Sequence, residues 1–382
     1  MSIWKRIEEL GKRIVDRLGK GSLTPLERWE KIRRFEEADR VMGSFAFWSP
    51  AAVGIQDIST REFYTNPEKM YFCQLLALER FCHDYPILIA DNYNTEPEAL
   101  GAKIAFAGDD TPMIVEPSLR NKEDLNQRGL PDPSKDGRLP YRIEICRIHK
   151  EVLGKYFPTL PSINAPFSMA VGMRGYEALI VDMVEDQDFV HELLEFCTRA
   201  IIVFGKAIKS ACGVYPSISD AWSSIPNLSP EMFFEFSFPY ATRCLEVFEH
   251  SGWSFGGGHQ FANDWKRSLR RILSSGVKSL NLFEENITGI RGGKTVDLKE
   301  IKGICQKRKI FLNTAIHPDN LLNGPAGKIE DLVQRLGETA ASGGGQAFYT
   351  SILMGTPFDH IDAYVKAIKR TTFPISSNKL SP

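Results

Sequence analysis

The sequence predicts an α/β protein, a (β/α)8 TIM barrel with an N-terminal helical extension. Short apolar runs alternate with longer amphipathic stretches along most of the chain, which is the order expected of parallel βαβ units. Polar side chains directly follow these runs, and barrel active sites lie at the carboxyl ends of the strands. An open doubly wound sheet is the alternative, but no G-x-G-x-x-G follows an early run.

The N-terminal extension is predicted to contain two helices. Apolar residues recur at helical spacing over residues 3–18, and Gly19 ends that pattern. A second helix opens with Thr24 as N-cap, Pro25 at the first helical position and Glu27 placed for a capping box. We therefore divide the chain into a helical extension, 1–40, and a barrel, 41–375. The first 22 residues are expected to form either a cap over the barrel base or a dimer arm, which leaves a homodimer open.

The predicted strands of the barrel are seven short apolar runs. They lie at residues 86–90, 161–171, 213–219, 252–255, 278–283, 309–315 and 346–352. Between them lie helical patterns, such as residues 186–211 and 230–252. The polar and proline-rich segment 116–140 is expected to run over the surface.

Composition and charge are those of a globular cytoplasmic protein. Of 382 residues, 43% are hydrophobic and 25% are charged. The 47 basic residues balance 48 acidic ones, which gives no reason to expect nucleic acid or an anionic membrane as a partner. No run approaches the roughly 18 apolar residues of a membrane span, and the charged N-terminus lacks a signal core.

The seven cysteines are predicted to be reduced thiols in the core. They are odd in number, scattered and without a C-x-x-C pair, which argues against a disulfide framework or a zinc knuckle.

The polar residues after the runs are the candidate site, and we expect several of them to share one pocket. Solvated loop residues without a shared function are the alternative. The predicted catalytic residues are His259, Asp91, Glu285 and Asp220. The predicted substrate-binding residues are Trp48, Tyr93, Asn94 and Asn313, and the predicted metal ligands are His259, Glu96 and His317.

The stretch "SFGGGHQFAND" (254–264) combines three glycines with a histidine. A phosphate loop would need the lysine and hydroxyl of a P-loop, which are missing here. A tight turn is expected, because glycine allows the backbone to bend sharply. That turn would place His259 at the barrel mouth, as a metal ligand or a general acid.

The order and spacing of several motifs resemble the uroporphyrinogen decarboxylase superfamily over residues 23–370. The motifs are "LTPLERW" with "ADRV", "PILIADNYNTEPEALGAKI", "INAPFSMAVGMRGYEALIVDMVEDQDFV", "SDAWSSIPNLSPEMFFEFSFPY", "FLNTAIHPDNLLNGPAGKIEDLV" and "AFYTSILMGTPFDHI". This superfamily includes the decarboxylase and many cobalamin-related methyltransferases. The resemblance implies a (β/α)8 barrel.

Two departures from the family motifs bear on the reaction. The stretch 41–55 corresponds to the arginine-rich loop that holds porphyrinogen carboxylates, but it contains no arginine or lysine. The aspartate that steadies the pyrrole nitrogens would be Asp91, with Asn92 as the other candidate. His259 takes the histidine position of the zinc motif of the thiol-methylating members, whereas Phe261 stands at the cysteine position and no cysteine lies near 350–351.

The resemblance therefore implies a methyltransferase closer to the corrinoid-dependent members than to the decarboxylase. It would move a methyl group from a small O- or N-methylated substrate to a corrinoid on a partner protein, with zinc or a general acid at the barrel mouth. One alternative is a cofactor-free lyase of the decarboxylase type, in which Asp91 and His259 act on a small substrate. The others are zinc-dependent alkyl transfer to a thiol and a barrel that binds without catalysis.

Overall fold

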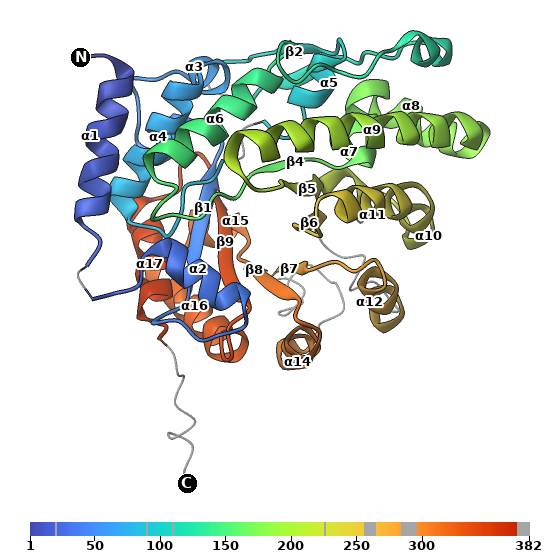
Figure 1. The fold of residues 1–382 in the computed structure, drawn as a ribbon. Helices are drawn as coiled ribbons and strands as arrows, with labels where there is room; N and C mark the ends of the chain where they lie inside the picture. The colour runs from blue at the N-terminus through green and yellow to red at the C-terminus, as the bar shows by residue number, and fades with distance from the viewer. Residues whose placement is uncertain are drawn as a thin grey trace.

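Parallel strands lie at the centre of the molecule and helices surround them (Figure 1). The computed structural model describes residues 1–19, 21–88, 91–108, 111–224, 227–255, 265–283 and 296–372. Across these ranges, every helix is too short or too polar to cross a lipid bilayer.

The parallel strands form two sheets. One contains β1 (Gly43–Phe47), β9 (Gln346–Ile352), β8 (Phe311–Ala315) and β7 (Ser279–Phe283), paired in that order. The other contains β4 (Ser162–Asn164), β5 (Ser217–Asp220) and β6 (Trp253–Phe255). Because β6 contacts β7, the strands follow one another around a common lumen, as in the predicted barrel.

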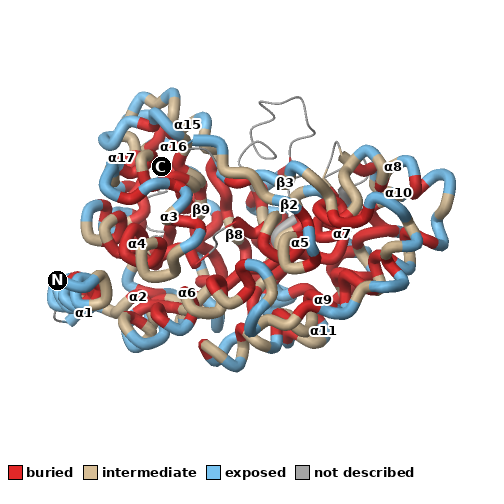
Figure 2. The backbone as a smooth tube through the Cα atoms, turned by 90° about the horizontal axis from the view of Figure 1, so that it is seen from above, coloured by how far each residue is buried: buried red, intermediate tan, exposed pale blue. Residues whose placement is uncertain are grey.

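The helices and short turns between the strands form the outer layer. They are α1 (Ile3–Asp16), α2 (Pro25–Arg33), η1 (Pro50–Val53), α3 (Thr60–Thr65), α4 (Pro67–Phe81), α5 (Thr95–Ala99), η2 (Lys122–Gln127), α6 (Leu139–Val152), α7 (Pro166–Arg174), α8 (Tyr176–Glu185), α9 (Gln187–Cys212), η3 (Ala221–Ser223), α10 (Pro230–Met232), the π-helix η4 (Phe233–Ser237), α11 (Phe238–Val247), α12 (Trp265–Leu273), α14 (Leu298–Arg308), α15 (Pro318–Asn323), α16 (Ala326–Ala340) and α17 (Phe358–Arg370). Their inner faces are buried and their outer faces exposed (Figure 2).

The predicted strand at 86–90 differs from the structure. Ser44 Oγ donates to the carbonyl of Tyr85 over 2.6 Å, so the chain does run beside β1. Residues 86–88 nevertheless form no strand, because Pro86 has no N–H and the Ile87 N–H donates to Gln74 Oε1 over 3.1 Å. Residues 89–90 lie outside the described part of the chain.

Two other predicted segments also differ in detail. Of the apolar run 161–171, only Ser162–Asn164 is a strand, because Pro166 starts helix α7. The polar segment 116–140 begins at the end of β3 (Met113–Glu116), which pairs with β2 (Lys103–Ala105) in a two-stranded antiparallel arm, and continues through η2.

The two N-terminal helices pack on different parts of the barrel. Helix α1 lies against α4 on the outer wall and buries Ile7, Leu10 and Ile14. Helix α2 begins with the predicted capping box of Thr24 and Glu27. The α2 helix, rather than residues 1–22, faces a small apolar cluster in the lumen, which is described below.

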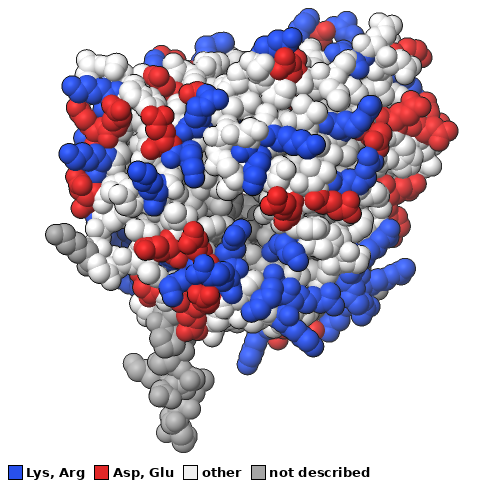
Figure 3. Space-filling model, viewed as in Figure 1, with Lys and Arg blue, Asp and Glu red and all other residues white. Residues whose placement is uncertain are grey.

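Charge is unevenly distributed over the surface. On the face in Figure 3, lysine and arginine side chains gather over α12 and α14, whereas acidic and basic side chains mix elsewhere.

Candidate active site

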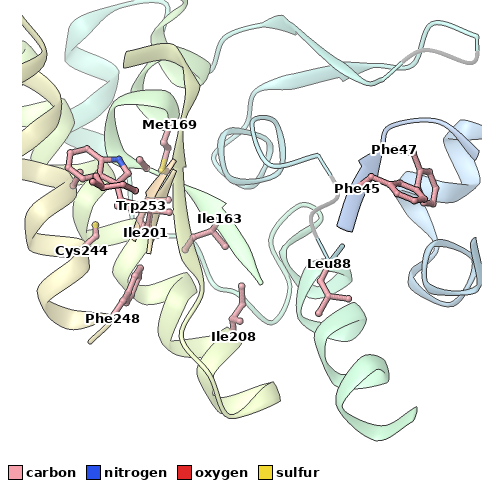
Figure 4. Close-up of a cluster of buried hydrophobic side chains, with 14 of the residues drawn as sticks. Phe45, Phe47, Leu88, Ile163, Met169, Ile201, Ile208, Cys244, Phe248 and Trp253 are labelled. Atoms are coloured by element: carbon pink, nitrogen blue, oxygen red, sulfur yellow. The ribbon is translucent and has the colours of Figure 1, made fainter. Parts of the chain in front are cut away.

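Alternate residues of the strands face the helices and the lumen. The helix-facing residues belong to the large core, which includes Phe45, Ile163 and Trp253 (Figure 4). The register places a second set of residues on the lumen side: Ser44, Ala46, Ser162, Asn164, Ser217, Ser219, Ser279, Asn281, Phe311, Asn313, Ala315, Ala347, Tyr349 and Ser351. All of these strand positions are uncharged.

The lower end of the lumen is apolar. Trp29 of α2 contacts the ring of Phe311 with a centroid distance of 5.1 Å and that of Tyr85 with 6.5 Å. Ala46 and Ala347 belong to the same cluster. This cluster closes the base of the barrel, because strand residues there face one another across the lumen.

Above this base the lumen is polar and open to solvent. Ser219, Asn281, Asn313 and Tyr349 are only half-buried, although they lie in central strands whose other residues are buried. Neutral hydroxyl and amide groups therefore face the lumen at positions that solvent reaches.

Tyr93 contacts the lumen side of β5. Its hydroxyl and Ser219 Oγ on β5 lie 2.7 Å apart. Burial raises the pKa of Tyr93 to about 12, and the nearby Asp220 and Tyr349 add to the effect. The phenol therefore remains protonated at neutral pH and can donate a hydrogen bond.

Asn164 is the least satisfied polar group of this lumen. It is fully buried at the end of β4, beside Ser219 in the register. Its Nδ2 and Oδ1 have no hydrogen-bond partner within the described ranges. A buried amide in this state costs about 1–3 kcal/mol per unmade bond, so it is suited to bind a ligand that both donates and accepts.

The remaining predicted substrate-binding residues lie near the lumen or behind it. Trp48 directly follows β1 and packs against the apolar cluster at the base, and Asn313 is paired in register with Asn281 of β7. Asn94 instead donates through Nδ2 to Asp91 Oδ1 and, over 2.7 Å, to the carbonyl of Pro112.

Asp91 and Glu98 are held by an arginine at the start of α6. Arg138 donates to Asp91 Oδ2 and, over 2.5 Å, to Glu98 Oε2. Burial raises the pKa of Asp91, although Arg138 opposes this. Asp91 also adopts a left-handed backbone with φ of 56°, which aspartate tolerates better than most residues.

Glu96 of α5 belongs to a second buried network. The arginine of this network, Arg142, lies one helical turn after Arg138 along α6. The two oxygens of Glu96 accept from Thr95 Oγ1 over 2.6 Å and from the Asn164 N–H over 2.9 Å. Burial raises the pKa of Glu96, opposed by Arg142. Arg142 itself donates to Asn92 Oδ1 over 2.8 Å. These bonds secure the loop between 91 and 99 to β4 and α6.

Asp220 bonds toward the helix layer. Its carboxylate accepts from Ser168 Oγ over 2.6 Å and from Ser237 Oγ over 2.5 Å. Burial raises its pKa against these hydrogen bonds. Asp220 thus joins β5 to α7 and η4, while its neighbour Ser219 faces the lumen.

The described residues do not assemble a metal site. His317 is the N-cap of α15, where its Nδ1 accepts from the Asp319 N–H over 3.2 Å. Across the described ranges, no three His, Cys, Asp or Glu side chains are placed to hold an ion. His259 and Glu285 lie outside these ranges, so their predicted roles stay predictions.

Sequence reasoning missed Asn164, Ser219, Arg138 and Arg142. The two arginines are four residues apart before and within a helix, a spacing that places both on one face. Asn164 and Ser219 alternate with the buried residues Ile163 and Ile218, which is a signal for the lumen side of a strand.

Comparison with known proteins agrees with the resemblance seen in the sequence. A family model described as uroporphyrinogen decarboxylase (URO-D) matches residues 51–371. The chain is 28% identical to the uroporphyrinogen decarboxylase of Xanthomonas campestris pv. campestris (strain B100) over 190 residues, 48% of this chain and 52% of that enzyme. The match thus spans about half the length of that relative. For the Xylella fastidiosa (strain Temecula1 / ATCC 700964) enzyme the identity is 24% over 321 residues, 80% of this chain and 85% of that enzyme.

A solved structure of a methyltransferase from Methanosarcina mazei is similar in fold. Its TM-score is 0.75 at 20% sequence identity, and the match covers 91% of this chain and 99% of that one. This likeness confirms the predicted fold class.

Proposed function

The chain belongs to the uroporphyrinogen decarboxylase (URO-D) family, and from that premise we propose that it is a corrinoid-dependent methyltransferase. It would move a methyl group from a small O- or N-methylated substrate to the corrinoid of a partner protein. The observation that carries the proposal is the set of neutral amides and hydroxyls on the lumen side of the strands, which includes Asn164 and Ser219, with Tyr93 bonded to Ser219. The structural likeness to a methyltransferase supports it.

The charge of the lumen argues against a porphyrinogen substrate. A substrate with many carboxylates needs several free cationic side chains. The stretch 41–55 supplies none, and Arg138 and Arg142 are already bonded to the groups around 91–98. A small substrate with few charges fits these surroundings better.

The cysteines argue against a thiolate-zinc site. All seven lie on the outer helices α4, α6, α9, α11 and α14 or at the end of α4. None lies on the lumen side of a strand, so zinc-dependent alkyl transfer to a thiol would need a zinc held in the lumen by nitrogen and oxygen alone. The described residues do not fit a zinc site.

In the proposed reaction the corrinoid supplies the nucleophile that takes the methyl group. The bond between the methyl carbon and the substrate oxygen or nitrogen breaks, and the electron pair stays on that heteroatom. The chain binds the substrate through Asn164, and the hydroxyl of Tyr93 hydrogen-bonds the heteroatom as charge develops there. His259 and Glu285 remain the candidates for delivering the proton.

The test is methyl transfer to free cob(I)alamin from a panel of methoxylated aromatic compounds and methylated amines, followed by visible absorbance. We expect turnover with at least one donor. A Tyr93→Phe variant should turn over more slowly, and Tyr156→Phe, at the exposed position 156, should match the unmodified protein. No transfer from any donor, together with carbon dioxide release from a carboxylated substrate, would favour the lyase suggested by the names of the curated relatives.

A further inference from the structure

One wall of the barrel is strongly basic, although the protein as a whole is nearly neutral. Residues 266–309 contain twelve lysines and arginines and four acidic residues, a net charge of +8 in a chain whose total is −1. The exposed basic side chains lie over α12, α14 and the turns beside them (Figure 3). They are Lys266, Arg267, Arg270, Arg271, Lys278, Lys299, Lys307, Arg308 and Lys309. We call this surface the basic wall.

Several of these cations have no acidic partner among the described residues. Lys266 pairs with Glu300 over 2.9 Å, and Arg271 lies 4.1 Å above the ring of Phe234. Five others form no ion pair within the described ranges: Arg270, Lys278, Lys299, Lys307 and Arg308. Like charges this close repel one another, so the wall creates a positive field that an anionic surface would relieve.

The basic wall begins at the mouth of the barrel. Helix α12 follows strand β6 and helix α14 precedes β8, and in a parallel barrel each such helix starts at the carboxyl end of the preceding strand. Lys266 and Lys299 belong to the first turns of α12 and α14. Lys278 directly precedes β7, and Lys307 and Arg308 end α14, so the wall extends from the mouth to the base of the barrel. A partner bound along it would lie beside the entrance to the lumen.

The shape and composition of the wall favour a protein as the partner. It consists of two helices joined by the Lys266–Glu300 pair, and it displays no exposed large hydrophobic side chain within 266–282 and 296–309. Single-stranded nucleic acid would find no aromatic platform there, and a membrane no apolar side chains to insert. We infer that the basic wall docks an acidic protein surface, which under the proposed function belongs to the corrinoid-bearing partner.

The experiment measures binding of fluorescent poly-L-glutamate and of a DNA duplex of matched charge by anisotropy at low and high salt. The test variant carries Arg270→Glu, Lys278→Glu, Lys307→Glu and Arg308→Glu. The control carries Lys5→Glu, Lys12→Glu, Lys155→Glu and Lys206→Glu, four exposed lysines elsewhere. We expect the test variant to bind poly-L-glutamate about tenfold or more weakly, the control within about twofold, and salt to weaken binding.

Equal loss in both variants, or tighter binding of the DNA than of poly-L-glutamate, would overturn the inference. Because the inference rests on the proposed function for the identity of its partner, a second measurement separates the two. Methyl transfer to free cob(I)alamin needs no docking, so the test variant should retain the unmodified rate, and a lower rate would count against a docking role. If no variant transfers methyl groups, the proposed function fails while the binding measurements still decide whether the wall binds acidic polypeptide.

Discussion

The side chain of Asn164 has the features of a ligand-binding group and not those of a group that stabilises the fold. Its backbone N–H donates to Glu96, whereas both side-chain polar atoms are buried without a hydrogen-bond partner among the described residues. An amide that stabilised the fold would be hydrogen-bonded. The unmade bonds are an energetic cost of the free protein that a bound ligand would remove.

We predict that Asn164→Leu leaves the free energy of unfolding unchanged or raises it by about 1 kcal/mol, since no hydrogen bond is lost and a buried polar group is replaced. Substrate turnover should fall at the same time. Urea unfolding and the methyl-transfer assay measure the two quantities.

Asn66 provides the contrast. Its Oδ1 accepts from the Lys69 N–H over 2.9 Å and caps α4, so Asn66→Leu should cost about 1 kcal/mol without a change in turnover. A strongly destabilised Asn164→Leu protein with normal turnover would show that Asn164 serves the fold.

At the scale of elements, α6 fixes the loop that carries Tyr93. The side chain of Arg142 is almost fully buried, and it bonds to Asn92 and Thr95 of the loop. Lysine could not replace Arg142, because a single ammonium group cannot donate to separate acceptors in the fixed directions that a planar guanidinium provides.

We predict that Arg142→Met destabilises the protein by about 3–5 kcal/mol, because the buried oxygens of Asn92, Thr95 and Ser162 would lose their donor. Arg147→Met on the same helix is the control. Arg147 is exposed and pairs with Glu144, so its loss should cost less than about 1 kcal/mol. Equal effects in urea unfolding would contradict the proposed role of Arg142.

Helix α2 closes the opposite end of the barrel through Trp29. Trp29→Ala should cost about 3 kcal/mol, because its ring packs on Phe311 and Tyr85 and would leave a cavity. Trp222, near the mouth, is 37% exposed, and Trp222→Ala should change stability by less than about 1 kcal/mol. A Trp29→Ala protein with unchanged stability would mean that α2 does not close the base.

For the whole molecule, the sequence predicted the alternating architecture because hydrophobic periodicity follows from burial. It also predicted the capping box at Thr24, because capping depends on residues that are close in the sequence. It could not show that Asp91, Glu96 and Asp220 are bonded to Arg138, Asn164 and Ser168. Those contacts join positions about 45–70 residues apart, and only the tertiary fold brings them together.

The same buried groups determine how the whole molecule responds to pH. Burial lowers the pKa of His83 to about 3 and that of His149 to about 4, whereas an unfolded histidine titrates near about 6.5. Below that pH the unfolded chain takes up protons that the folded chain cannot. Stability is therefore fully present above the unfolded pKa and falls on acidification, by about 1.4 kcal/mol per pH unit for each histidine.

The buried carboxyls change the pH dependence of the free energy of unfolding in the opposite direction to the histidines. Burial raises the pKa of Asp91, Glu96 and Asp220, so the folded state binds their protons first and gains stability as the pH falls through those raised values. The loss of stability caused by the two histidines starts near the pKa of an unfolded histidine. We therefore expect the histidines to determine how the free energy of unfolding changes with pH just below neutrality.

We predict that the free energy of unfolding decreases between pH 7 and about pH 5, measured by urea unfolding at each pH. His83→Leu should roughly halve that slope. Neither ring nitrogen of His83 has a partner within the described ranges, and the ring packs on Phe45 at 4.3 Å, so leucine removes the titration without removing a hydrogen bond.

His149→Gln tests the second histidine, whose Nδ1 and Nε2 lie 3.1 Å from Tyr71 Oη and the Pro158 carbonyl. A slope that both substitutions leave unchanged would place the pH sensitivity in other groups.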